Sequence, residues 1–437
     1  MPFDPSTIEC VGDLASLQRG NTYKSALLGF PGPTLLGLAS IARGGGFRSD
    51  NLKTYGGDCP EKLLLNPGDL YVSLKDVTQA ADLLGAVARV PVGVHGRLTQ
   101  DTVKLVMPGI PDAWKAYLYW LLRAPEYRAY CKANSMGTTN LSLSREDFLE
   151  YPVPPLSASR QHIVAALENI EARIDHNRAL AANLEAIARA LFKSWFVDFD
   201  PVRAKAAGEA PPGLAPDLAA LFPDRFVDSE LGEIPEGWAC SPITKIAAVH
   251  SGGTPKRAVD EYWGGTIPWY SVVDAPRLGE VFVIETSEHI TEAGSTNSAA
   301  KALPHGVTII SARGTVGKLA LTCGPMTINQ SCYALKGTLG DFFTYFTIAA
   351  SIDWLKQNVH GAVFDTITRA TLDGLLVIRP SDQAARAFED TVRPIMLRIE
   401  ACSREARVLA KLRDLLLPRL ISGKLRVEDA EAAMEAA

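Results

Sequence analysis

Two long segments of the chain carry apolar residues at alternating spacings of four and three. Because a 3.5-residue repeat puts these positions on one face of a helix, the pattern predicts two long helices packed as a coiled coil. A polar residue at a core position, Asn177, is typical of a device that fixes the register of such a pair. The first set is Ile163, Leu167, Ile170, Ile174, Asn177, Ala181, Leu184, Ala188, Leu191 and Trp195, and the second is Phe388, Val392, Ile395, Ile399, Cys402, Ala406, Leu409, Arg413, Leu416 and Leu420.

The segments that precede each long helix carry short runs of β-branched and aromatic residues, separated by glycines. Such runs are typical of strands joined by turns. A helix-like stretch also precedes each long helix, at residues 114–132 and 342–358. The pattern predicts an α/β (α+β) domain followed by a long helix, twice. The expected strands lie at 35–42, 69–74, 103–106, 238–251, 265–273, 281–284, 307–312, 319–322 and 331–335.

The two halves of the chain share landmarks at nearly constant displacements. Residues 144–148 correspond to 368–372 at a displacement of 224, and Gly137 corresponds to Gly361 at the same displacement. Pro155 matches Pro380 after one inserted residue, and residues 65–73 resemble 303–311 at a displacement of 238. Self-similarity of this kind indicates an internal duplication. We therefore expect two similar domains joined to two long antiparallel helices, as a pseudo-two-fold repeat.

Composition excludes several classes of protein. The chain has 437 residues, 47% of them hydrophobic and 21% charged, which is ordinary for globular domains. No stretch approaches the 18 or more uninterrupted apolar residues of a membrane span. The seven cysteines are scattered and form neither a disulfide framework nor a zinc motif. We expect a soluble cytoplasmic protein with no membrane partner and no metal site.

The net charge of −5 argues at first against a nucleic-acid partner. However, residues 206–240 alone carry seven acidic residues and one basic residue. The same segment is rich in proline, which predicts an acidic linker at 206–237. The remaining segments are nearly neutral, so bulk charge does not decide the partner.

The sequence lacks the motifs of the catalysts that act on DNA or nucleotides. It has no Walker-type phosphate loop, no dinucleotide fingerprint and no His-Glu-x-x-His. No lysine has an acidic residue two positions before it, and no Asn/Asp-Pro-Pro-Tyr/Phe is present. The former is needed by the commonest DNA-cleavage site and the latter by adenine methyltransferases. These absences favour a recognition protein over an enzyme.

Several motifs strongly resemble those of the specificity subunits of type I restriction–modification systems. The resemblance covers essentially the whole chain, although residues 1–156 lack a clear Gly-Gly-Thr-Pro or Arg-Gly-Thr-Val-Gly. The matching motifs are LFKSWFVDFDPVR at 191–203, EIPEGW at 233–238, SGGTPK at 251–256, YWGGTIPW at 262–269, SARGTVGK at 311–318, INQS at 328–331 and LPRLISGKL at 417–425.

This resemblance implies a non-catalytic subunit that reads a bipartite site on double-stranded DNA. Two modification subunits would dock on its helices and bring S-adenosylmethionine, and restriction subunits would add ATP and Mg²⁺; the chain itself would hold no cofactor. Each target-recognition domain would read one half of the site, and the helices would set the spacer. The expected domains are 1–155 (first recognition domain), 156–205 (central long helix), 206–237 (linker), 238–380 (second recognition domain) and 381–437 (C-terminal long helix).

Candidate DNA-contacting residues lie in the glycine-rich loops of the two domains. Arginine reads guanine and Asn or Gln reads adenine in the major groove, whereas lysine mostly neutralises phosphate. Ordinary solvated loop cations are the alternative for each charged residue, and a turn-capping role is the alternative for Asn329. The candidates are Lys256, Arg257, Arg313, Lys318, Asn329 and Gln330 in the second domain and Arg43, Arg48, Lys53 and Lys75 in the first.

Candidate partner-binding residues follow the end of the first long helix. Phe196 and Phe199 lie off the apolar seam, and exposed aromatic residues commonly mark interfaces. Asp200 and Arg203, with Asp198, would form a polar rim. Two other functions remain open at this stage: a self-sufficient restriction enzyme or methyltransferase, and a coiled-coil scaffold that binds proteins without reading DNA.

Overall fold

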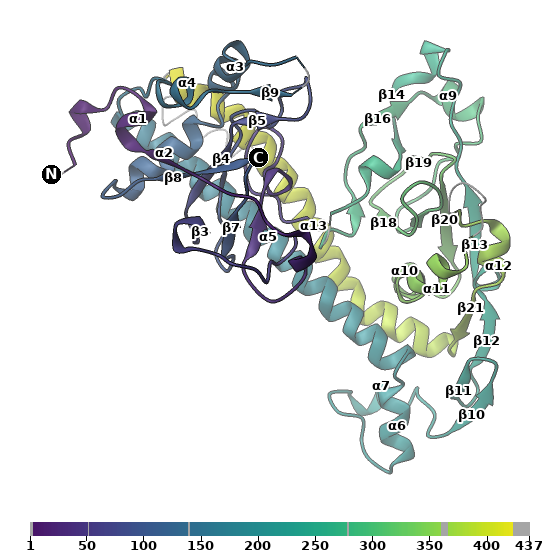
Figure 1. Cartoon of the computed structure of the whole chain (residues 1–437). Coiled ribbons are helices and arrows are strands. Elements are labelled where there is room, and N and C mark those ends of the chain that lie inside the picture. Colours follow the sequence, from purple (N-terminus) through teal and green to yellow (C-terminus); the bar gives the residue numbers. More distant parts are fainter. Residues whose placement is uncertain (1–2, 51, 139, 278, 360–365, 423–437) are drawn as a thin grey trace. The chain divides into compact units, whose positions relative to one another are not determined.

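The computed structural model describes residues 3–422 except 51, 139, 278 and 360–365, without the side chains of 420–422. Two compact units share these residues: unit 1 is Met1–Ile174 with Arg407–Ala437, and unit 2 is Asp175–Ala406. Two long helices, α5 (Ala158–Phe196) and α13 (Asp382–Ser422), contribute residues to both units (Figure 1). The landmark Gly361 and the end of the C-terminal segment, 423–437, lie outside the described residues.

Unit 1 is built around a four-stranded antiparallel sheet with the order β1-β8-β4-β6. A smaller sheet has the order β2-β7-β3, and two short strands, β5 and β9, pair with each other in a separate sheet. Its elements are α1 (Val11–Leu14), β1 (Ser16–Arg19), β2 (Thr34–Leu36), β3 (Leu64–Leu65), β4 (Leu70–Ser73), β5 (Lys75–Asp76), β6 (Val87–Arg89), β7 (Gly96–Leu98), β8 (Thr102–Val106), α2 (Asp112–Leu121), α3 (Pro125–Ala133), β9 (Leu141–Ser142) and α4 (Arg145–Leu149).

Unit 2 contains a five-stranded sheet with the order β13-β20-β17-β18-β15 and a three-stranded sheet, β16-β14-β19. Its elements are α6 (Asp200–Ala206), α7 (Pro216–Ala219), β10 (Phe226–Ser229), β11 (Gly232–Pro235), β12 (Ala239–Pro242), α8 (Ile243–Ile246), β13 (Ala247–Ser251), β14 (Trp263–Tyr270), β15 (Phe282–Val283), β16 (Glu288–Ile290), α9 (Glu292–Thr296), β17 (Thr308–Ser311), β18 (Leu319–Thr322), β19 (Thr327–Ile328), β20 (Cys332–Gly337), α10 (Asp341–Ala350), α11 (Ile352–Gln357), α12 (Arg369–Asp373) and β21 (Leu376–Arg379).

Most of the expected strands and helices are present, with breaks where the backbone requires them. The expected strand at 238–251 is wrong as a single element, because it forms β12, the short helix α8 and β13. Pro242 stands at the start of α8, where its missing N–H costs no hydrogen bond. The helix-like stretch at 114–132 is two helices, α2 and α3, and Pro125 begins the second.

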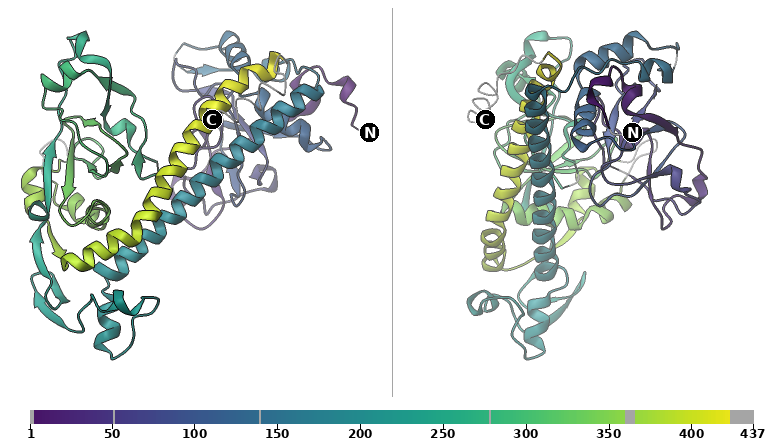
Figure 2. Two further views of the ribbon diagram at one scale, coloured as in Figure 1. Left: turned by 180° about the vertical axis from the view of Figure 1, so that it is seen from behind. Right: turned by 90° about the vertical axis from the view of Figure 1, so that its left-hand side faces the viewer.

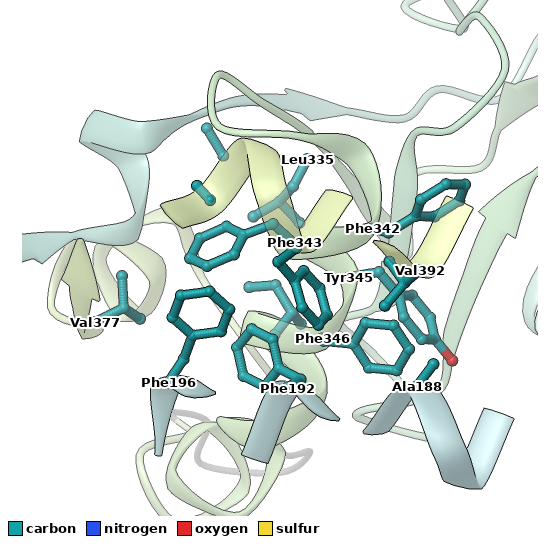
Figure 3. Packing of buried hydrophobic residues seen from close by; sticks show 14 of the residues in the cluster. Ala188, Phe192, Phe196, Leu335, Phe342, Phe343, Tyr345, Phe346, Val377 and Val392 are labelled. Atoms are coloured by element: carbon teal, nitrogen blue, oxygen red, sulfur yellow. The ribbon is translucent and has the colours of Figure 1, made fainter. Parts of the chain in front are cut away.

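Aromatic side chains from three helices form the main core of unit 2 (Figure 3). Phe343 and Phe346 of α10 are almost fully buried against Phe192 of α5, with ring centroids 5.7 and 6.0 Å apart. Phe388 of α13 lies 5.5 Å from the ring of Phe192. Each fully buried aromatic residue stabilises the fold by roughly 1.5–3 kcal/mol. In this unit the end of α5 and the start of α13 therefore lie side by side, as both views in Figure 2 show.

The segment expected to be an acidic linker is folded. Residues 206–237 contain α7 and a hairpin of β10 and β11, whose strands pair from Phe226–Pro235 to Ser229–Gly232. Phe222 and Ile234 are buried in the main core of unit 2. The acidic and proline-rich composition reflects the exposed surface of this segment, and its few apolar residues hold it in place.

A buried carboxylate joins the second domain to its long helix. Glu389 of α13 accepts hydrogen bonds from the backbone N–H groups of Phe342 and Phe343, at the first turn of α10, at 3.1 Å each. These N–H groups have no partner within their own helix, and the positive end of the helix dipole favours an anion there. The contact therefore ties the sheet domain to α13.

Candidate nucleic-acid interface

Three loops of the second domain meet at one end of its five-stranded sheet. Strand β20 is antiparallel to both β13 and β17, so the residue that begins β20 lies beside the residues that end the other two strands. Ser251 pairs with Tyr333, and Ser311 pairs with Cys332. The loops at 252–257, 312–318 and 329–331 therefore converge at this end of the sheet.

Backbone hydrogen bonds hold the three loops together. Gly252 N–H donates to the carbonyl of Cys332, and Ala312 N–H donates to that of Ser331, at 3.3 and 2.7 Å. Gln330 is exposed, and its amide oxygen accepts a hydrogen bond from the hydroxyl of Thr254 in the first loop. The backbones of the three loops are thus fixed relative to one another.

Three cations at this end are exposed and unpaired among the described residues. Lys256 lies in the first loop, and Arg313 and Lys318 lie in the second. Lys318 is positioned by its backbone N–H, which donates to the Ser311 hydroxyl at 2.8 Å. Arg313 pairs through its backbone with Thr366, next to residues that lie outside the described part. This arrangement offers positive charge and one guanidinium fork to an anionic ligand.

Arg257 differs from these cations because its charge is already compensated. Its guanidinium forms a bidentate contact with the carboxylate of Glu288 and lies 3.9 Å from the ring of Trp263. The hydrogen bond from Arg257 lowers the pKa of Glu288, and the same bond raises the pKa of Arg257. Arg257 therefore braces its loop against β14 and β16. Sequence reasoning missed Trp263 and Glu288, although a tryptophan near an arginine is a signal for stacking.

Asn329 is engaged in a local turn. Its side-chain oxygen accepts a hydrogen bond from Ser331 N–H at 3.0 Å, and its backbone N–H donates to the carbonyl of Tyr270 at 2.9 Å. This is the turn-capping role considered as the alternative to base reading. The neighbouring Gln330 is exposed, so its side-chain amide is the one in this loop that can contact a ligand.

The four candidate cations of the first domain are all on its surface, and three of them are paired. Arg43 lies 3.7 Å from Asp82, Arg48 lies 3.1 Å from Asp50 within its own loop, and Lys75 lies 3.6 Å from Asp101. Lys53 is exposed beside β2, where its carbonyl accepts from Leu35 N–H. Of these, Lys75 closely follows the end of β4.

The expectation that Phe196 and Phe199 are exposed is wrong. Both side chains are buried in the main core of unit 2. The ring of Phe196 lies 5.3 Å from that of Phe388, and the ring of Phe199 lies 5.9 Å from that of Trp238 (Figure 3 shows Phe196). Their place off the heptad seam turns them toward the second domain and the hairpin instead of toward solvent. They therefore offer no exposed ring to a partner.

The polar residues after Phe199 remain on the surface. Asp200 begins α6 and is exposed, and Arg203 donates from Nε to the carbonyl of Asp198 at 2.8 Å. The guanidinium of Arg203 also lies 5.2 Å from the ring of Phe226. These residues stabilise the turn that follows α5.

The described residues include no cluster of three or more His, Cys, Asp or Glu side chains that could hold a metal ion.

The large pKa changes belong to buried aromatic and thiol groups: burial raises the pKa of Tyr117 to about 12 and that of Cys131 to about 11. Tyr117 donates to the carbonyl of Pro154 at 2.9 Å, so its position is explained by packing. In the part of the chain that the structure describes, no helix is both long and apolar enough to cross a membrane.

Comparisons with known proteins point to the same family that the sequence motifs resemble. Residues 235–386 match the family model of the type I restriction modification DNA specificity domain. The chain is 26% identical over 358 residues to the HindI specificity subunit of Haemophilus influenzae, covering 71% of this chain and 77% of that protein. It is 25% identical over 417 residues to the MjaIX specificity subunit of Methanocaldococcus jannaschii, covering 88% and 91%.

The fold is also similar to that of a solved structure. The S subunit of the type I restriction–modification system from M. genitalium aligns with a TM-score of 0.55 at 14% identity, over 94% of each chain. The match to the specificity domain spans all three loops at the end of the five-stranded sheet. These comparisons therefore confirm the resemblance of this chain to the specificity subunits of type I restriction–modification systems, and residues 235–386 carry the match to the DNA specificity domain itself.

Proposed function

We propose that this chain is the DNA sequence-specificity subunit of a type I restriction–modification complex and is not itself a catalyst. The observation that carries the proposal is the coincidence of two features at residues 235–386. This range matches the specificity domain, and its sheet gathers Lys256, Arg313, Lys318 and Gln330 at one end. Cations suit phosphate, and an arginine and a glutamine suit base edges in the major groove.

We propose that the two halves are a duplicated domain and that each half reads one half of a bipartite site. Support comes from the two main sheets. Numbered along the chain, the strands β1, β4, β6 and β8 have the spatial order first-fourth-second-third, and so do β13, β17, β18 and β20. Every neighbouring pair in both sets is antiparallel. Ser144 and Thr368, displaced by 224, cap equivalent short helices with their side chains.

We also propose that α5 and α13 form an antiparallel coiled coil that sets the spacer and docks two methyltransferase subunits. Within unit 1, Glu171 of α5 contacts Arg413 near the end of α13 at 2.9 Å. Within unit 2, Phe192 near the end of α5 contacts Phe388 near the start of α13. This order of contacts is the one that an antiparallel pair requires. Most seam positions of both helices are buried, including Ile174 and Ile399.

The modification subunits would bring S-adenosylmethionine, and restriction subunits would bring ATP and Mg²⁺; this chain would supply the reading of DNA sequence. A scaffold that binds only proteins is not favoured, because the specificity-domain match covers a DNA-reading module. The direct test is to express the chain with and without the modification subunit of its own host and to sequence the methylated DNA. Adenine methylation at one bipartite motif, only when both chains are present, is the expected result. Methylation that needs no second chain, or that ignores sequence, would overturn the proposal.

A further inference from the structure

The first domain has its own set of three converging loops, which its sequence conceals. Strand β8 is antiparallel to both β1 and β4, and Arg19 pairs with Val103 while Ser73 pairs with Thr102. The loops after β1 and β4 and the loop before β8 therefore meet at one end of this sheet, as the corresponding loops do in the second domain. In that domain the equivalent pairs are Ser251–Tyr333 and Ser311–Cys332.

Matching hydrogen bonds give the register of each loop. Gly20 N–H donates to Thr102 in the first domain, and Gly252 N–H donates to Cys332 in the second, at 3.2 and 3.3 Å. A Cβ atom on Gly20 would overlap the backbone carbonyl of Thr99, and one on Gly252 would overlap that of Asn329. Both glycines are therefore needed for the same close approach of two loops. Thr99 thus stands in the place of Asn329.

The middle loop matches in the same way. Gly85 N–H donates to the carbonyl of Ser73 at 2.7 Å, and Gly317 N–H donates to that of Ser311 at 3.0 Å. Beyond each serine, Lys75 pairs through its backbone with Ser142, and Arg313 pairs with Thr366. Lys75 and Arg313 are 238 residues apart, as are Ser73 and Ser311. Ser142 and Thr366 are 224 residues apart, which is the displacement of the sequence repeat. Lys75 therefore stands in the place of Arg313.

We infer that residues 20–24, 74–78 and 99–101 form the DNA-contacting end of the first domain, with Lys24 and Gln100 in the places of Lys256 and Gln330. Lys24 is four residues after Gly20, as Lys256 is after Gly252, and Gln100 follows Thr99 as Gln330 follows Asn329. This inference rests on the proposed function and adds the residues that read the first half-site.

The surroundings of these residues suit the role. Lys24 and Gln100 are exposed, and neither side chain has a hydrogen-bond or ion-pair partner among the described residues. The buried Arg97 stabilises the loop that carries Lys24. Its guanidinium donates to the side-chain oxygen of Asn21 at 2.6 Å and to the carbonyl of Thr22 at 3.2 Å. The backbone of this loop is therefore held in place while the side chain of Lys24 remains exposed.

The two ends also differ in charge. Lys75 lies near Asp101, whereas the position of Asp101 is taken in the second domain by the uncharged Ser331. Ala86 takes the place of Lys318, because the carbonyl of Ala86 accepts from Ser73 N–H as that of Lys318 accepts from Ser311 N–H. The first domain thus presents less free positive charge, so its half-site depends more on Gln100 and Lys24. An adenine is the base that a glutamine side chain recognises with two hydrogen bonds.

The test uses the full chain expressed with its modification subunit, with methylation of both half-sites as the readout. Gln100→Ala is expected to relax the preference at one base pair of one half-site and to leave the other half-site unchanged. Gln330→Ala is expected to do the reverse. Lys24→Ala is expected to weaken methylation of all sites at least several-fold without changing their sequence. The control is Lys115→Ala, because Lys115 follows the opposite end of β8 and should leave methylation unaltered.

The possible failures are distinguishable. Gln100→Ala and Lys24→Ala chains that methylate the wild-type sites at the wild-type level would overturn this inference, while a relaxed half-site in Gln330→Ala would leave the proposed function intact. A wild-type complex that methylates no bipartite site would overturn the proposed function itself. If Gln100→Ala loses all methylation, the variant Gln100→Asn is tested next, because its shorter side chain keeps the same amide hydrogen-bonding groups. Partial recovery of methylation at the same half-site would support the inference, and no recovery would contradict it.

Discussion

The cationic side chains at the candidate DNA-contacting ends fall into two groups, those with and those without a carboxylate partner, and both groups contain lysine and arginine. Lys256, Arg313 and Lys318 keep an exposed charge without a described partner, whereas Arg257 and Lys75 lie beside the carboxylates of Glu288 and Asp101. A charge that is already paired must exchange that partner before it can bind phosphate. The free cations are therefore the stronger candidates for direct contact.

At the residue scale, we predict different effects for two neighbours on the same loop. If Arg313 reads a guanine, Arg313→Ala should cost about 1–3 kcal/mol of binding free energy and relax specificity at one base pair. Lys318→Ala should weaken binding to all sequences by a similar factor, because a phosphate contact carries no sequence information. Methylation profiles of the two variants measure the difference. Identical changes in both profiles would refute the assignment, and neither variant should alter the other half-site.

Single elements of the structure are tied together by buried or partly buried polar contacts as well as by apolar packing. Glu389 of α13 accepts hydrogen bonds from the first turn of α10, and Glu168 of α5 accepts from Arg89 and from the indole N–H of Trp120, at 2.9 and 2.6 Å. Each domain is therefore fixed on its own long helix by a carboxylate. The two anchors are built differently, so they are not copies of one another.

At the element scale, Glu389 predicts a pH-dependent stability. Burial raises the pKa of Glu389 above its ordinary value of 4.5, although the N–H groups of Phe343 and Phe342 oppose this. A raised folded-state pKa means that the folded chain binds the proton more tightly, so this contribution to stability is present below pH 4.5 and is lost as the pH rises through the folded-state pKa. The Tm of the wild type minus the Tm of Glu389→Gln should therefore increase as the pH falls from 8 to 5, because only the glutamate can take up the proton.

Thermal unfolding of both full-length chains across this range checks the prediction. The exposed neighbour Asp390 provides the matched control, because Asp390→Asn removes a carboxylate on the same helix without removing the contact to α10. A Tm difference that shrinks toward low pH would show that the N–H groups of α10 outweigh burial at Glu389.

The molecule as a whole has an acidic net charge of −5, and much of the acidic excess lies in the folded segment 206–237. Several cations near the candidate DNA-contacting ends are also compensated by carboxylates. A chain of this kind has little free positive charge with which to bind DNA alone. The partner subunits would then supply much of the basic surface.

We therefore predict a difference in salt dependence between the isolated chain and the complex. The affinity for DNA falls with salt in proportion to the number of phosphates neutralised. The isolated chain should bind weakly with a shallow slope of log affinity against log salt, and the complex should show a steeper slope. Titrations of one DNA duplex at several salt concentrations measure both. Equal slopes and equal affinities would contradict the prediction.

The proposed ruler role of the helices leads to a further prediction. One heptad added between Ile174 and Leu184, with a matching heptad between Ile399 and Leu409, keeps the phase of the seam. It lengthens each helix by roughly 10 Å at 1.5 Å per residue, which is about 3 bp at ~3.4 Å per step. Both half-site sequences should persist while the preferred spacer grows by up to this amount. A folded and active double-insertion chain that methylates sites with the original spacer would show that the helices do not set it.

Local pattern determined a large part of this protein. The heptads define α5 and α13, because a helix that must bury one face needs apolar residues at that period. Short runs that are mainly apolar define β17, β18 and β20, and the glycine-rich motifs of the second domain indicate its loops and lie within its match to the DNA specificity domain. All of these signals arise from residues close together in the chain, so sequence alone contains them.

Tertiary structure decided what depends on residues far apart. Phe196 and Phe199 are buried because the second domain and the hairpin of β10 and β11 cover them, which no local period reveals. The match of Lys24 to Lys256 is hidden because its displacement is 232, whereas that of Lys75 is 238 and that of Gln100 is 230. Loops of unequal length shift the alignment between strands, and only the strand pairing restores it, because hydrogen bonds fix which residues of distant strands lie opposite one another.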